Sequence, residues 1–153
     1  MPVTMNEDPM LGFLHSAKEA KLDVRRHRRR VALLRSQCEQ ISSRMTAAPG
    51  GGTDHGKEEL WAALSDAKTE ETGLVKKALG QHRAVETFID GLPDPRYRSI
   101  LRLRYLEGLG WTRLQFALRE EGIYYSERQL RRLHAAALTA ARAKWGQREE
   151  SIQ

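Results

Sequence analysis

The chain has 153 residues, enough for one domain with an extension, and its 26 Lys and Arg residues against 20 Asp and Glu residues give a formal net charge of +6. A basic balance of this kind favours a nucleic-acid partner. No apolar run approaches the ~20 residues of a membrane span, and no signal-peptide pattern opens the chain, so we expect no membrane partner. Cys38 has no second cysteine to pair with, which fits a reducing cytoplasm.

Residues 1–9 are expected to be a disordered tail, and residues 10–92 a long antiparallel helical hairpin of coiled-coil type. In its first helix, every seventh residue from position 10 is apolar, and so are the residues three positions later, except His27. This is an a/d heptad seam. Its members are Met10, Ala17, Val24, Val31, Cys38 and Met45, with Phe13, Ala20, His27, Leu34 and Ile41.

A loop is expected over 47–56, because Pro49 and the glycines after it cannot continue a helix. The second helix is expected over 57–91. One apolar stripe in it is interrupted at Lys68 and Glu71, and it comprises Trp61, Leu64, Val75, Ala78, His82, Val85, Ile89 and Leu92. A parallel stripe covers the gap through Leu60, Ala67, Leu74 and Phe88. Two stripes indicate more than one neighbour, so we expect a homodimer through the hairpin; a monomeric hairpin is the alternative.

Charge is distributed unevenly along the chain. Residues 10–46 hold nine Lys and Arg against three Asp and Glu, and residues 54–95 hold five against nine. Residues 96–145 hold eleven against four, and ten of the eleven are arginine, the residue suited to phosphate and guanine recognition. The basic run of residues 25–30 is either a solvated helix face or a second phosphate-contacting surface.

Residues 93–145 read as three helices. Asp94 is a suitable N-cap and Pro95 a suitable first residue for a helix that ends at Gly108. A short amphipathic helix follows over 110–121, and Gly122 opens the turn because it accepts a left-handed conformation. The third helix begins after Ser126, and residues 146–153 are expected to be a flexible tail.

Ser126 and Gln129 form the capping-box pattern at the start of this third helix. Its core side is Leu130, Leu133, His134, Ala137, Leu138, Ala141 and Trp145. Arg128 and Arg132 fall on the opposite side, and Arg131 flanks them. A capped helix with a cationic outer face, preceded by a short helix and a turn, is typical of a helix-turn-helix protein that enters the major groove of DNA.

These residues resemble the RinA/ArpU-type phage transcriptional regulators, whose C-terminal part is similar to region 4 of bacterial sigma factors. The resemblance rests on the last third of the chain: Leu92-Pro93, 97–105, Gly110-Trp111, 125–134 and Ala137-Leu138. The segment 119–125 is longer than the usual turn. The resemblance implies an all-α fold with a sigma-like head, binding of double-stranded DNA, contact with RNA polymerase, and the cytoplasm of a bacterial host. The expected DNA-binding residues are Thr112, Arg113, Ser126, Arg128, Arg131 and Arg132.

Two alternatives stay open. A small-terminase-like DNA-packaging protein also combines these parts, but usually places the DNA-binding part first. A polymerase-binding module without DNA readout is the other. An enzyme is not expected, because no histidine pairs with another histidine or with Cys38 at metal-ligand spacing, and Gly50-Gly51-Gly52 lacks the surroundings of a phosphate loop. No cofactor or metal is expected.

Overall fold

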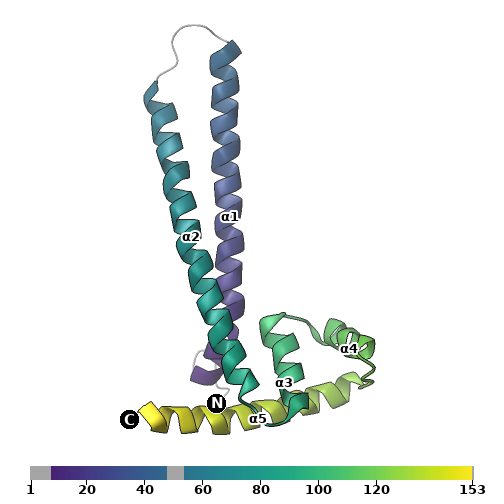
Figure 1. The fold of residues 1–153 in the computed structure, drawn as a ribbon. Coiled ribbons are helices and arrows are strands. Elements are labelled where there is room, and N and C mark those ends of the chain that lie inside the picture. The colour runs from purple at the N-terminus through teal and green to yellow at the C-terminus, as the bar shows by residue number, and fades with distance from the viewer. Residues whose placement is uncertain (1–7, 48–53, 153) are drawn as a thin grey trace, which may run out of the picture. The chain divides into compact units, whose positions relative to one another are not determined.

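The computed structural model describes residues 8–47 and 54–152, and these are helical with no strand, as the sequence predicts. The helices are α1 (Pro9–Ala47), α2 (Asp54–Asp90), α3 (Pro95–Leu101), α4 (Trp111–Glu120) and α5 (Glu127–Ile152) (Figure 1). A π-helical turn, η1 (Arg102–Leu106), follows α3 directly. In the described part of the chain, no helix is long and apolar enough to cross a membrane.

The chain divides into two compact units. One is Ala20–Ala78, called here the two-helix unit. The other, called here the head unit, combines Met1–Glu19 with Leu79–Gln153. The core of the head unit therefore extends beyond the expected domain of 93–145, because it draws on the first residues of α1 and the last residues of α2.

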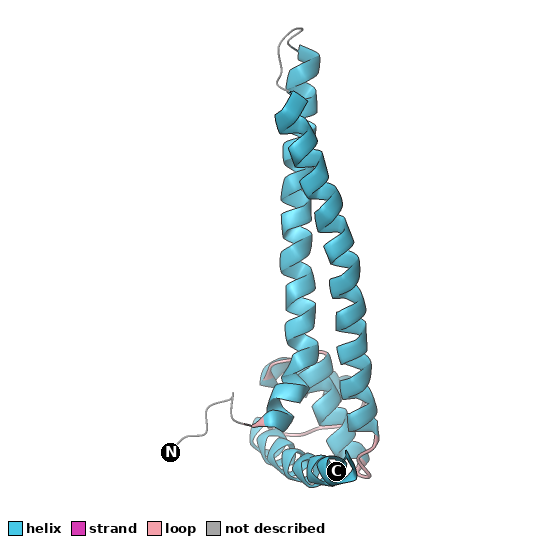
Figure 2. Cartoon of the chain, turned by 90° about the vertical axis from the view of Figure 1, so that its left-hand side faces the viewer, coloured by secondary structure: helices cyan, strands magenta, loops and turns pink. Residues whose placement is uncertain are grey.

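In the two-helix unit, α1 and α2 lie side by side (Figure 2). Successive contacts advance along α1 while they retreat along α2: Ala20 and Val24 pack with Ala78, and further on Val31 and Cys38 pack with Leu64 and Ala67. These buried residues of α1 are members of the predicted heptad seam. The side chain of Met45 lies outside the described residues.

His27 is the one polar member of that seam and is buried. Its Nε2 lies 2.6 Å from the carbonyl oxygen of Ala67, so the ring donates this hydrogen bond, and its Nδ1 lies 3.9 Å from Glu70. On α2, the expected seam residue Trp61 is instead 45% exposed, whereas Leu60 and Ala67 of the parallel stripe pack against α1. The second stripe therefore covers the contact at this end.

Helix ends differ from the expected ones at three places. Asp8 caps α1 by accepting bonds from the backbone N–H groups of Met10 and Leu11, and Pro9 is already helical. Residues 48–53 of the expected loop, like 1–7 of the expected tail, lie outside the described residues, while Asp54 begins α2. At the C-terminus, α5 continues to Ile152 rather than ending at Trp145, since the Trp145 indole N–H donates to Glu149 one turn later.

The helix expected over 94–108 becomes a π-helical turn after Leu101. Asp94 does cap α3, accepting the backbone N–H of Arg96 at 2.9 Å. Beyond it, the N–H of Glu107 reaches back five residues to the carbonyl of Arg102, and Gly108 takes a positive φ of +71°. The wide turn ends the helix and directs the chain toward α4.

The core of the head unit joins residues from every one of its helices. Phe13 of α1, Phe88 of α2 and Trp145 of α5 form an aromatic cluster with ring centroids 5.1–5.7 Å apart. Around it lie fully or nearly fully buried apolar residues: Met10, Leu14, Ala17, Val85, Ile89, Leu92, Ile100, Leu101, Leu103, Tyr105, Leu106, Leu114, Leu118, Leu130, Ala137 and Ala141. This core fixes the position of the N-terminal part of α5.

Candidate nucleic-acid interface

The start of α5 is fixed by the predicted capping box. The Ser126 hydroxyl accepts the backbone N–H of Gln129 at 3.1 Å, and the Gln129 side-chain oxygen accepts the backbone N–H of Ser126 at 2.9 Å. Two amide groups that would otherwise lack partners at a helix start are thus satisfied. The hydroxyl of Ser126, a predicted DNA-binding residue, is thus used to cap α5.

The turn before α5 is equally well defined. Gly122 has a φ of +83°, the left-handed conformation expected of it. The N–H groups of Gly122 and Ile123 bond to carbonyls at the end of α4, both at 2.9 Å. The Gln115 side chain crosses the turn and donates to the carbonyl of Tyr125 at 2.8 Å. The longer turn is therefore an ordered connection that sets α5 relative to α4.

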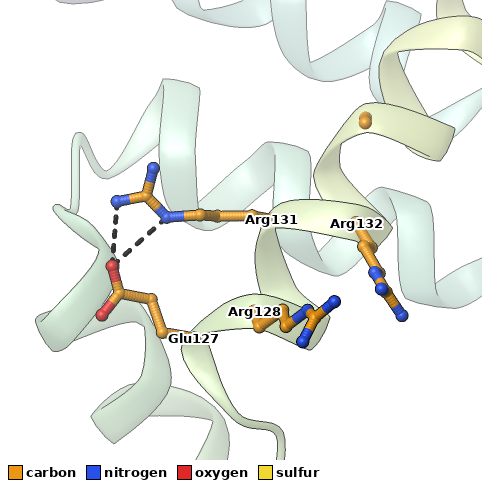
Figure 3. Close-up of a pocket in the computed structure, with 5 residues that line it drawn as sticks. Glu127, Arg128, Arg131 and Arg132 are labelled. Atoms are coloured by element: carbon orange, nitrogen blue, oxygen red, sulfur yellow. Dashed lines mark hydrogen bonds and ion pairs between the residues drawn. The ribbon is translucent and has the colours of Figure 1, made fainter.

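Arg128 and Arg132 lie on the exposed side of α5, opposite Leu130, Ala137 and Ala141, which are completely buried. Together with Glu127, Arg131 and Ala135 they line a shallow depression (Figure 3). Neither Arg128 nor Arg132 makes an ion pair or hydrogen bond with any described residue. Their guanidinium groups are available to an external anion or acceptor.

Arg131 is arranged differently from its two neighbours. Its Nε and Nη2 donate to one oxygen of Glu127, Oε1, at 3.2 and 2.9 Å, as the dashed lines in Figure 3 show. Its guanidinium also lies 5.2 Å from the centre of the Trp111 ring, which is a cation–π distance. Of the three predicted reading arginines, Arg131 is thus the one held by its own chain.

Thr112 and Arg113 lie in the first turn of α4 and are exposed. The N-cap residue, Gly110, has no side chain to satisfy the backbone N–H groups there. Neither residue lines the depression on α5. Free N–H groups, a hydroxyl and a guanidinium at a helix start suit contact with a phosphate.

Most of the remaining basic residues of 96–145 form ion pairs or hydrogen bonds with other residues of the head unit. Arg102 pairs with Glu86 and Asp90, and Arg142 pairs with Asp8 at 3.1 Å. Others bind within the unit: Arg96 with Asp94, Arg98 with the carbonyls of Leu92 and Pro93, Arg104 with the carbonyl of Leu109, and Lys144 with the carbonyl of Phe88. The arginines of this region without a partner among the described residues are Arg113, Arg119, Arg128 and Arg132.

A partly buried polar contact joins α5 to η1. The hydroxyl of Tyr105, in η1, lies 2.9 Å from Nε2 of His134. Burial, together with the charge of Arg104, lowers the pKa of His134 to about 4, so the ring is neutral at pH 7 and shares one hydrogen bond with the hydroxyl. Trp111 packs edge-on against the same ring. His134 is a packing residue with a hydrogen bond, as its core-side position predicts.

Sequence reasoning missed two of these features. The Glu127–Arg131 pair has the i, i+4 spacing of a helical ion pair and could have been found from that spacing. The Tyr105–His134 contact joins residues 29 positions apart and carried no local signal. In the described residues, no group of three or more His, Cys, Asp or Glu residues could hold a metal ion.

No family model, no curated protein and no solved structure matches the chain. The resemblance to the RinA/ArpU-type regulators is a prediction from the residues alone.

Proposed function

We propose that this protein is a sequence-specific DNA-binding transcriptional regulator of the RinA/ArpU type, with α4, the turn and α5 as a helix-turn-helix. The observation that carries the proposal is the surface of α5: a capped helix start presents Arg128 and Arg132 without acidic partners, opposite a completely buried face.

The geometry of α5 suits the major groove. Arginine donates two parallel bonds to O6 and N7 of guanine, and it also pairs with phosphate oxygens. The exposed Ala135 follows Arg128 by two helical turns and adds little bulk, so a base edge can approach the helix there. Thr112 and Arg113, at the start of α4, would bind a phosphate and so fix the register of the head on the duplex.

The hairpin of α1 and α2 is proposed to pair two copies of the chain in the bacterial host cytoplasm. A dimer would place two heads on two half-sites, and linking two weak contacts raises the overall affinity. The proposed reading surface consists of Glu127, Arg128, Arg131, Arg132 and Ala135 on α5, and the basic run of α1 is not part of it.

A second candidate, a module that contacts RNA polymerase, is favoured by one observation. Phe116 on α4 and Tyr124 in the turn are 64% and 76% exposed, and aromatic side chains are enriched in protein–protein interfaces. This contact is compatible with DNA binding, since Phe116 and Tyr124 are separate from the depression on α5.

Selection of bound fragments from a pool of random-sequence duplex DNA tests the proposal. The full chain should enrich one defined site, and its affinity for that site should fall steeply with salt, by a slope of roughly 0.9 per phosphate contact on a double-logarithmic plot. Enrichment of no sequence, with retention of purified RNA polymerase in a pull-down, would favour the second candidate instead.

A further inference from the structure

The reading surface proposed above contains one carboxylate, on Glu127. It lies in the first turn of α5, beside Arg128 and Arg131, and its side chain is 52% exposed. The bonds from Arg131 use Oε1 only, which leaves Oε2 as an acceptor directed at no described residue. In the same way, Arg131 uses Nε and Nη2 and leaves Nη1 as a donor. The pair therefore offers an acceptor and donors side by side.

The pair is held in place by an aromatic ring. Arg131 lies over Trp111 at 5.2 Å, and Arg104 lies over the same ring at 4.5 Å. Arg104 is in turn bonded to the carbonyl of Leu109 at 3.0 Å. A side chain already fixed in one geometry loses less conformational entropy when it binds, so this arrangement favours selective contact.

A carboxylate on a DNA-facing surface has a cost. It is repelled by phosphates, so Glu127 weakens binding to every duplex alike. That cost is offset only where the carboxylate accepts a hydrogen bond from a base. In the major groove, the amino group of cytosine is the usual donor to Glu, and it stands beside the O6 and N7 acceptors of its guanine partner.

We propose that Glu127 and Arg131 act together as a specificity-determining pair that reads one C·G base pair. Oε2 of Glu127 accepts from N4 of cytosine, and the free donors of Arg131 bond to guanine. A T·A or A·T pair offers no such order of one donor followed by two acceptors. The inference rests on the proposed function and adds to it the base pair that this edge of α5 selects.

The test repeats the selection from random-sequence duplex DNA with the full chain and three variants: Glu127→Ala, Glu127→Gln and, as a control, Glu39→Ala. Glu39 is an exposed acid of α1 without a partner among the described residues, so its loss removes the same charge away from the head. Wild type and Glu39→Ala should enrich the same site. Glu127→Ala should keep that site except at one C·G position, where discrimination of about tenfold or more should disappear.

Two further results are expected. Glu127→Ala should bind an unrelated duplex more tightly than wild type, because a charge repelled by phosphates is gone. Glu127→Gln should move the preference at the same position toward A·T, since an amide can both accept from N6 and donate to N7 of adenine. Circular dichroism checks that both variants keep the helical content of wild type.

The outcomes distinguish failure of the reading pair from failure of the proposed DNA-binding function. If wild type enriches no site, both are overturned. If wild type enriches a site that the Arg128→Ala/Arg132→Ala double variant no longer binds, but Glu127→Ala retains every base preference, DNA recognition stands and the reading pair is overturned. Loss of preference at one position alone supports the reading pair.

Discussion

The hydroxyl of Tyr105 and Nε2 of His134 lie 2.9 Å apart and join the π-helical turn η1 to α5. The ring is neutral at pH 7, and Trp111 packs against it. This partly buried contact joins α5 to the rest of the head unit, so its stability affects how firmly the helix is held.

We expect Tyr105→Phe to destabilise the protein by about 1–3 kcal/mol, because Nε2 of His134 then loses its hydrogen-bond partner. Urea denaturation followed by circular dichroism measures the change. Tyr97→Phe is the control, since that ring is half-buried and no hydrogen bond of its hydroxyl is described. Equal midpoints for the two variants would show that the Tyr105 bond adds nothing to stability.

His134 should also make stability depend on pH. Its pKa is about 4 in the folded chain and near 6.5 when unfolded, so between these values the unfolded chain binds a proton that the folded chain does not. Stability is therefore full above pH 6.5 and falls as the pH is lowered toward 4. We expect a loss on the order of 1–2 kcal/mol, since the partly exposed ring is screened by solvent.

His134→Gln isolates this effect, because glutamine does not titrate and the other histidines are unchanged. The quantity to compare is the free energy of unfolding of wild type minus that of His134→Gln, between pH 7.5 and 4 as an approximate working range. The difference should shrink on acidification. A difference that stays constant with pH would mean that His134 has an ordinary pKa.

The capping box gives a separate prediction. Ser126→Ala should cost about 1 kcal/mol, because the N–H of Gln129 loses its acceptor. Ser65→Ala is the matched control, an exposed serine inside α2 where alanine is the better helix former. Thermal melts of both variants should show a lower midpoint for Ser126→Ala only; equal midpoints would place the start of α5 elsewhere.

The two-helix unit should be separable from the head unit. Replacing Ala20–Ala78 by a short glycine-serine linker keeps the residues of α1 and α2 that belong to the head core, so this variant should fold. If the hairpin pairs two copies, light scattering should give a dimer for the full chain and a monomer for the variant. The full chain should then bind its selected site on the order of 100-fold more tightly. A full chain that is monomeric at micromolar concentration would overturn the proposed homodimer.

By contrast, a fragment that begins at Asp94 should not fold stably. It lacks Phe13 and Phe88, which pack against Trp145, and it lacks Val85, Ile89 and Leu92. Circular dichroism of the fragment should show much less helix than the linker variant shows for the same residues.

What the sequence could predict here is what is encoded within a turn or two of helix. The capping box of Ser126 and Gln129, the cap at Asp94 and the heptad seam of α1 depend on residues three to seven positions apart. The structure confirms both caps and buries Ala20, Val24, Val31 and Cys38 of the seam. The exposure of Trp61 was missed because Leu60 and Trp61 differ by only about 100° around the helix, so two stripes compete for one contact.

Other features depend on the tertiary fold. The cation–π contact of Arg131 depends on Trp111, which a different helix supplies. Met10, Leu14 and Ala17 pack in the head core with residues about a hundred positions away. A pattern within one helix cannot predict such contacts. Gly146 lies inside α5, although glycine suggests a helix end. Side-chain contacts continue past it: the indole of Trp145 donates to Glu149, and Arg148 lies over the rings of Phe13 and Trp145.

The central claim, that α5 binds DNA through its unpaired arginines, is tested most directly by fluorescence anisotropy on the selected duplex with two double variants. Arg128→Ala/Arg132→Ala removes the proposed contacts, and Arg35→Ala/Arg83→Ala removes the same charge from exposed arginines of α1 and α2 that have no partner among the described residues. We predict that the first double variant loses specific binding, by about 100-fold or more at two contacts of roughly 1–3 kcal/mol each, and keeps its helical content, while the second binds as wild type does. Equal affinity of both double variants for the selected duplex would contradict it.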